Sequence, residues 1–327
     1  MTVTIKDVAE HAGVSTATVS RVLNGSPNVT ENLVRRVHST IAELGYRPNS
    51  AARTLKTKKT NTIGILIPDI SNSYFMQIAK GIEDVIAPYG FSLIFASSDE
   101  DSAKEAKLLE VLSEYRVDCL VLATAGGNDE QIKRTKNLGT PIVLVDRLPA
   151  SLLKDIDYVV GDNYDAAYRL TVHLMQQGAK SFGLIHGPMA ASTAFQRALG
   201  CREALKDSGV PARAIQEHYG DFSREAGACA TRKLLSEGRP EAIIALNNSM
   251  AVGAIWELAH QDLVPGEDIL FGSYGDLEII PPLPKPLPFI EQQPRNLGVR
   301  VGEIVRRRLL EQDTGPFTQV VPQQLIV

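Results

Sequence analysis

The sequence predicts an α/β chain with a three-helix head, a short hinge helix and two doubly wound parallel-sheet lobes. Three observations carry this prediction. Two short helical patterns meet at Gly13, within the first 25 residues. From Thr62 onward, short apolar runs alternate with amphipathic segments. The first 60 residues are basic, with nine Lys or Arg against four Asp or Glu, whereas the other 267 residues carry a net charge of −9.

The head reads as a helix-turn-helix followed by a third helix. Apolar residues at i, i+3 and i+4 mark the inner faces of the first two helices: Ile5, Val8 and Ala9, then Val19, Val22 and Leu23. Gly13 can adopt a positive φ where the first helix ends. Ser15 is a suitable N-cap for the second helix, and Thr30 for the third, which Gly45 ends.

The outward face of the second helix carries Thr16, Ala17, Ser20 and Arg21. Small side chains and one arginine suit a helix that enters a DNA major groove, which is about 12 Å wide. Arginine can donate two hydrogen bonds to guanine, and a threonine or alanine methyl group can contact the methyl group of thymine. The alternative is an ordinary helical hairpin with a polar outer face.

The run from Ile5 to Asn24, including Asp7-Val8-Ala9, Ala12-Gly13-Val14-Ser15 and Thr18-Val19-Ser20-Arg21-Val22-Leu23-Asn24, resembles the DNA-binding head of the lactose-repressor (LacI/GalR) family. The resemblance continues through Ala42–Tyr46 and Ala51–Leu55 and runs more loosely to the C-terminus. It implies a DNA-binding domain over 1–48, a hinge helix over 49–60 and an effector-binding domain over 61–327. Its first lobe would span about 61–160 and 291–317, and its second about 161–290 and 318–327, as in periplasmic binding proteins.

The resemblance also implies which residues contact DNA. They are Thr4, Ser15, Thr16, Ala17, Thr18, Ser20, Arg21, Asn24, Asn28, Arg53 and Leu55. Leu55 would be the apolar wedge that unstacks the central base step of an operator. The alternative for the segment around Leu55 is a plain flexible linker rich in Lys and Thr.

Composition excludes several classes of protein. The 327 residues contain no apolar run long enough for a membrane span, and Met1 leads into the first helix without a signal-peptide pattern. The cysteines, Cys119, Cys201 and Cys229, lack metal-site spacing. We therefore expect a cytoplasmic protein with no cofactor, no metal and no membrane partner.

The rest of the chain alternates between strand and helix patterns, which is typical of parallel sheets covered on both faces. Strands are expected over 62–67, 91–96, 119–123, 142–146, 182–186, 242–246 and 269–271. Helices are expected over 74–87, 103–115, 166–177, 198–208, 226–236, 250–261 and 296–311.

Ligands of open parallel sheets bind beyond the carboxyl ends of the strands, so candidate effector residues lie there. Those chosen from strand ends and from the family resemblance are Tyr74, Phe75, Asp146, Arg147, Thr193, Arg197, Phe222, Asn247 and Gly275. The Arg197 guanidinium offers five donors that suit hydroxyl, carboxylate or phosphate groups. As alternatives, Phe75 could belong to the core, Arg147 could tie down a loop, and Arg197 could form a surface ion pair.

One position departs from the family pattern. Ser273-Tyr274-Gly275-Asp276 places Gly275 where the family usually has a ligand-binding aspartate. Together with Arg197, this suggests an effector with fewer hydroxyls or more negative charge, such as a sugar acid, a sugar phosphate or a small organic acid. Ala191, where purine-binding members have an arginine, argues against a purine.

Two rival functions would be an enzyme and a periplasmic solute receptor. No nucleophile, P-loop or zinc-protease motif supports an enzyme. A periplasmic solute receptor would need a signal peptide and would leave the basic head unexplained. We therefore expect a transcriptional regulator, most simply a repressor, of a carbohydrate or organic-acid catabolic operon. It would bind a pseudo-palindromic double-stranded operator as a homodimer and respond to a sugar, sugar acid or sugar phosphate.

Overall fold

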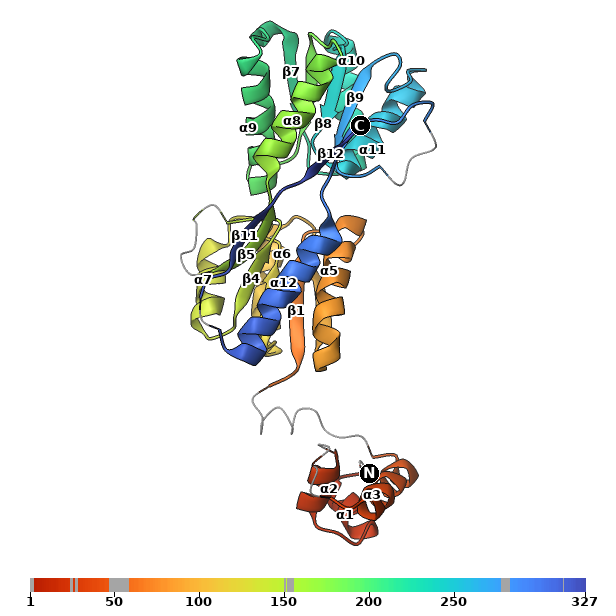
Figure 1. Cartoon of the computed structure of the whole chain (residues 1–327), viewed down its shortest axis with the longest axis vertical. Helices are drawn as coiled ribbons and strands as arrows, with labels where there is room; N and C mark the ends of the chain where they lie inside the picture. The colour runs from red at the N-terminus through yellow and green to blue at the C-terminus, as the bar shows by residue number, and fades with distance from the viewer. Residues whose placement is uncertain are drawn as a thin grey trace. The chain divides into compact units, whose positions relative to one another are not determined.

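The computed structural model describes residues 3–23, 26, 29–46, 59–149, 151, 156–277, 283–313 and 315–327. The chain forms two compact units, Met1–Thr60 and Asn61–Val327 (Figure 1). The head holds α1 (Ile5–His11), α2 (Thr16–Leu23) and α3 (Glu31–Leu44). No helix among the described residues is both long enough and apolar enough to span a membrane.

The head is built as its sequence pattern predicts. Its core joins all three helices through Val8, Ala9, Ala12, Val19, Val22 and Val37. Gly13 has φ +59° between α1 and α2, and Gly45 ends α3 in the left-handed conformation. Thr30 occupies the N-cap position of α3, but its side chain makes no capping hydrogen bond.

The larger unit contains two lobes, and the first is built on a wholly parallel sheet of order β11-β5-β4-β3-β1-β2. Its strands are β1 (Thr62–Ile67), β2 (Ser92–Ser97), β3 (Cys119–Leu122), β4 (Ile142–Val145), β5 (Asp157–Gly161) and β11 (Thr318–Val321). Its helices are α5 (Ser73–Ile86), α6 (Ser102–Glu114), α7 (Asp129–Asn137) and α12 (Pro294–Arg306), with short turns at Ala87–Tyr89 and Arg307–Glu311. Separate apolar cores form on the two faces of the sheet.

The second lobe has a sheet of order β12-β10-β9-β8-β6-β7, in which only the β10–β12 pair is antiparallel. Its strands are β6 (Phe182–His186), β7 (Ile215–Tyr219), β8 (Ala242–Ala245), β9 (Leu270–Tyr274), β10 (Phe289–Glu291) and β12 (Gln324–Ile326). Its helices are α8 (Asn163–Gln176), α9 (Ser192–Asp207), α10 (Arg224–Glu237) and α11 (Asn248–His260), with a short turn at Ala212–Ala214. The predicted helix-turn-helix head and two doubly wound lobes are confirmed, whereas residues 49–58 of the expected hinge helix lie outside the described residues.

Three segments connect the lobes: Asp162 between β5 and α8, residues 292–293 between β10 and α12, and residues 322–323 between β11 and β12. Figure 1 shows β11 and β12 as successive arrows of one ribbon, one in each lobe. Our boundary at residue 318 was therefore wrong, because Thr318–Val321 pairs with β5 in the first sheet. A short strand does not reveal its pairing partner in its own sequence.

Two helices differ from the sequence-based expectation. Helix α9 begins at Ser192, six residues before the expected start, so Thr193 and Arg197 lie on a helix instead of in a loop. Helix α7 was missed because it is mostly polar, with Ile132 and Thr135 as its buried residues. Its apolar periodicity was therefore too weak to detect.

Candidate functional site

The start of the head is fixed by hydrogen-bonded caps. Thr4 and Asp7 form a capping box at the start of α1, and the hydrogen bonds from Thr4 lower the pKa of the Asp7 carboxyl. The Ser15 hydroxyl accepts from the Thr18 amide at 3.1 Å, which caps α2 as expected. The hydroxyls of Thr4 and Ser15 therefore stabilise the helix starts.

The outward face of α2 remains open for contact. Thr16, Ala17 and Arg21 are exposed, while Ser20 and Thr18 are partly buried beside them. The arrangement presents one guanidinium and small side chains on one face of a rigid helix, as reading of base edges requires. The other DNA-binding candidates, Asn24, Asn28, Arg53 and Leu55, lie outside the described residues.

Between the lobes lies a cavity of about 250 Å³, which we call the inner pocket. Eight of the nine candidate effector residues line it: Tyr74, Phe75, Asp146, Arg147, Thr193, Arg197, Phe222 and Asn247. They come from both lobes and lie at the carboxyl ends of strands or in the first two turns of the helices that follow. The structure thus brings together residues separated by up to 173 positions in the sequence.

On the wall formed by the first lobe, the Tyr74 hydroxyl donates to Asp146 Oδ1 at 2.7 Å, and both residues are buried. Burial and the neighbouring Asp146 carboxylate raise the pKa of Tyr74 well above its usual value. Asp146 has φ +63°, an uncommon backbone conformation for a non-glycine residue at the end of a strand. The hydrogen bond leaves further acceptor capacity on Asp146 for a ligand hydroxyl.

Arg147 is tied to a loop, which is the alternative left open by the sequence. Its guanidinium donates to both Glu100 carboxylate oxygens, at 2.6 and 2.8 Å, and lies 5.1 Å from the centre of the Phe222 ring. The Arg147 side chain is only 5% exposed. Its charge is therefore largely neutralised before any ligand enters the inner pocket.

On the wall formed by the second lobe, Arg197 is buried without a carboxylate bonded to it. Its Nε donates to Asn163 Oδ1 at 2.8 Å, and Nη1 donates to the Leu246 carbonyl at 2.9 Å. The guanidinium carbon lies 3.8 Å from the centre of the Tyr274 ring. These contacts fix the orientation of the guanidinium, and no surface ion pair is seen for Arg197 among the described residues.

Phe222 and Asn247 complete the second wall. Phe222 has φ +69° and lines the pocket where an aromatic floor was expected. The Asn247 side chain caps α11 by accepting from the Met250 amide at 3.1 Å, and its amide nitrogen donates to Asn248 Oδ1 at 3.2 Å. Asn247 therefore positions the start of α11 as well as lining the cavity.

Gly275 is the candidate that does not line the inner pocket. It is buried with φ +108°, and a β-carbon placed there would lie 2.9 Å from both the Asn248 β-carbon and Gln292 Oε1. An aspartate would be strained in this backbone conformation and would need neighbouring atoms to move. The role of Gly275 as an effector contact stays a prediction, and a side chain at this position would have to displace Asn248 or Gln292.

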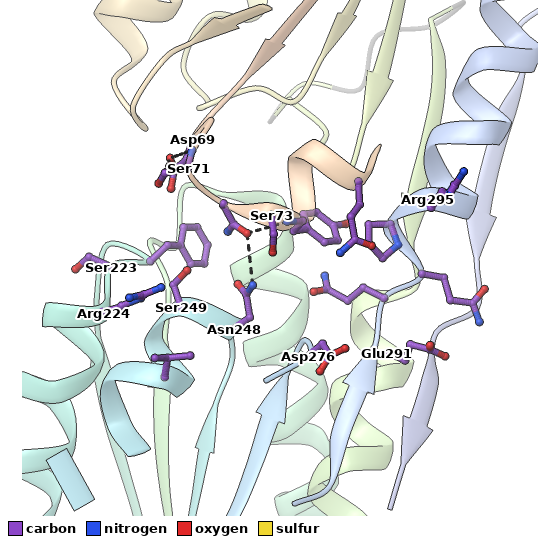
Figure 2. Close-up of a pocket in the computed structure, with 18 of the residues that line it drawn as sticks. Asp69, Ser71, Ser73, Ser223, Arg224, Asn248, Ser249, Asp276, Glu291 and Arg295 are labelled. Carbon is purple, nitrogen blue, oxygen red and sulfur yellow. Dashed lines mark hydrogen bonds between the residues drawn. The ribbon is translucent and has the colours of Figure 1, made fainter. Parts of the chain in front are cut away.

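The sequence reasoning missed eight residues that line the inner pocket: Asp69, Asn72, Asp99, Glu100, Asp221, Ser223, Asn248 and Gln292. Asn72 caps α5 and accepts a long, 3.4 Å hydrogen bond from Asn248 across the two lobes. Figure 2 shows this contact within a wider groove of about 760 Å³ that adjoins the inner pocket, with Ser73 on one lobe and Ser249 on the other. For Asn72, its position as a helix N-cap shortly after a strand end was the available signal.

Fold and cavity together define a two-lobed ligand-binding unit joined to a helix-turn-helix head. Residues 4–49 match the family model for bacterial regulatory proteins of the lacI family. Residues 60–298 match the model for periplasmic binding proteins and the sugar-binding domain of the LacI family. The chain belongs to the LacI family of transcriptional regulators.

Individual relatives agree with this assignment. The chain is 37% identical to catabolite control protein A of Priestia megaterium over 78% of this chain and 77% of that protein. It is 32% identical to the ribose operon repressor of Halalkalibacterium halodurans over 99% and 96% of the two chains. Among solved structures, the Lac repressor bound to ONPG in the repressed state superposes with a TM-score of 0.85 at 27% identity, covering 100% and 99% of the two chains.

Proposed function

We propose that this protein is a cytoplasmic repressor, not an enzyme, of a carbohydrate or organic-acid catabolic operon. The observation that carries the proposal is the presence, in one chain, of a basic head with an open recognition helix and a polar pocket between two lobes. Of the relatives named above, one is a ribose operon repressor and another is the Lac repressor bound to ONPG in the repressed state. Thr16, Ala17 and Arg21 would read bases, and the segment around Leu55 would enter the minor groove.

The charges of the inner pocket favour a neutral sugar over the anionic effector that Gly275 suggested. Among the described lining residues, five carboxylates face two arginines: Asp69, Asp99, Glu100, Asp146 and Asp221 against Arg147 and Arg197. Glu100 already pairs with Arg147, and Asp99 pairs with Lys104, so Asp69, Asp146 and Asp221 remain against Arg197. An anion would therefore meet a surplus of negative charge, whereas sugar hydroxyls can donate to Asp146 and accept from Arg197.

The size of the inner pocket supports the same choice. At about 250 Å³ it is smaller than the roughly 300–1,000 Å³ of pockets that hold drug-sized molecules. A monosaccharide fits this description better than a disaccharide, which would have to extend into the adjoining groove. We therefore infer a neutral monosaccharide as the effector, with sugar acids and sugar phosphates as the competing classes.

The direct test is footprinting of the purified protein on the DNA upstream of its own gene and neighbouring operons. We expect protection of a pseudo-palindrome, and a neutral sugar should change operator affinity by about 5–150-fold. Arg21→Ala serves as the control, since loss of a base contact should weaken specific binding by about 1–3 kcal/mol. Absence of protection at low salt, where phosphate contacts are strongest, would contradict the proposal.

If the protein forms a dimer, we expect the exposed edge strand of the first sheet to lie at the interface. Within the described part of the chain, strand β2 pairs with β1 alone, and it exposes Ile94 and Phe95, which are 39% and 40% accessible. An exposed apolar edge strand normally needs a partner. Phe95→Glu should raise the dimer dissociation constant by about 100-fold, measured by sedimentation, because it would bury an unpaired charge. Leu138→Glu, at an exposed helix end, should leave the dimer intact, and equal effects of both changes would argue against this surface.

A further inference from the structure

Gln323 lies in the third segment that connects the lobes, between β11 and β12. It is only 3% exposed, whereas its neighbour Gln324 is exposed. An uncharged amide buried inside a connecting segment must satisfy its hydrogen-bonding groups locally, or it destabilises the fold. The contacts of Gln323 therefore show what the segment is fixed to.

Gln323 contacts both lobes. Its Oε1 accepts a hydrogen bond from the Tyr274 hydroxyl at the end of β9, and its backbone carbonyl accepts from Arg169 Nη2 at 2.6 Å, both in the second lobe. Its amide nitrogen lies against Gly161, the last residue of β5 in the first lobe, so closely that a β-carbon at Gly161 would overlap it. The side chain thus fills the space that glycine leaves at the first connecting segment.

Tyr274 continues the chain of contacts to the pocket. Its ring lies 3.8 Å from the Arg197 guanidinium carbon, within cation–π distance. Arg197 donates to Asn163, and Asn163 Nδ2 in turn donates to the Gly161 carbonyl at 3.0 Å. The contacts form a closed ring through Gln323, Tyr274, Arg197, Asn163 and Gly161, and all five residues are buried.

We infer that Gln323 is a positioning residue that fixes Tyr274, and through it Arg197, to the segments connecting the lobes. This closed set of contacts fixes the position of Arg197 relative to two of the three connecting segments. A ligand that draws the Arg197 guanidinium toward itself pulls on both Tyr274 and Asn163. Movement of these two residues changes the contacts at Gly161 and Gln323. The inference rests on the proposed function only for the role of Arg197 as a ligand residue.

The test is hydrogen–deuterium exchange of the full-length dimer without ligand, followed by mass spectrometry. Gln323→Leu keeps the approximate side-chain volume but removes the acceptor for Tyr274. We expect exchange to become about tenfold faster in peptides covering 157–163, 270–275 and 318–325, with other regions unchanged. Gly161→Ala should reproduce this pattern, because its methyl group displaces the Gln323 amide. Gln324→Leu is the matched control and should behave as the unmodified protein.

A combined variant separates positioning from simple packing. If the hydroxyl–amide contact closes the ring, Tyr274→Phe with Gln323→Leu should exchange no faster than either single variant. Additive acceleration, uniform acceleration across both lobes, or no change in Gln323→Leu would overturn the inference. Because the measurement uses neither operator nor effector, its failure would leave the proposed function untouched, and failure of the footprinting test would not alter these exchange rates.

Discussion

Replacement of Arg197 by methionine is expected to weaken effector binding by about 100-fold while the protein still protects its operator. Methionine retains much of the apolar volume but removes the guanidinium that lines the inner pocket. This loss of affinity corresponds to two hydrogen bonds from the charged guanidinium to the effector, each contributing about 1.5 kcal/mol. Calorimetry with the sugar that alters the footprint measures the binding, and footprinting measures the operator.

Lys206→Met provides the control for Arg197→Met, because Lys206 is exposed on the same helix, α9, and does not line the pocket. It should bind effector as the unmodified protein does. Removal of Arg197 also leaves the Leu246 carbonyl without that donor, so some loss of thermal stability is expected. Unchanged effector affinity in folded Arg197→Met would show that the arginine only supports the Tyr274–Asn163 region.

The sequence predicted the head well because its signals are local. Apolar residues at helical spacing, Gly13 and the Ser15 cap each act within a few residues, and the structure places all of them as expected. The Tyr274–Gly275 turn shows the limit of such reasoning. A glycine at a ligand position suggested a missing charge, but its φ of +108° and the lack of room for a side chain beside Asn248 and Gln292 became visible only in three dimensions.

The sequence could identify residues that line the inner pocket, but not how their charges are paired. Strand ends, together with the family resemblance, identified eight of the sixteen lining residues, since parallel strands direct their carboxyl ends to one edge. The ion pair between Arg147 and Glu100 joins residues 47 positions apart. Glu100 lies in a loop after β2 that has no distinctive sequence pattern. That ion pair neutralises one of the two pocket arginines and, with the other carboxylates of the lining, supports the proposed neutral sugar.

The membership of β11 in the first sheet was likewise not predictable. Thr318–Val321 carries too few residues for its alternation to specify a partner, and pairing with β5 is a contact over about 160 positions. The consequence is functional, because it moves the third connecting segment to residues 322–323. Gln323 therefore lies at the junction of the lobes, where the earlier boundary would have placed it within the second lobe.

Gly298→Ala is expected to lower the free energy of unfolding by about 3 kcal/mol, the upper range for overpacking of a well-packed contact. Gly298 lies on α12 where this helix crosses α5, and a β-carbon there would overlap the carbonyl oxygen of Ile78 and lie 3.0 Å from the Gly81 α-carbon. Both obstacles are backbone atoms, so no side-chain rotation can relieve them. The helices must separate, which opens the apolar core beneath them.

Whether Gly298→Ala stabilises or destabilises the protein distinguishes close helix packing from helix propensity. In an unhindered helix, alanine in place of glycine stabilises by about 1 kcal/mol, so packing and helix propensity predict opposite outcomes. Thermal unfolding should show a melting temperature lower by roughly 10 °C. Gly315→Ala, where a β-carbon would meet no atom within 4 Å, should leave it unchanged. A stabilised Gly298→Ala would mean that α5 and α12 are less closely packed than described, and that the start of α5, which carries Tyr74 and Phe75 into the pocket, is not held by this crossing.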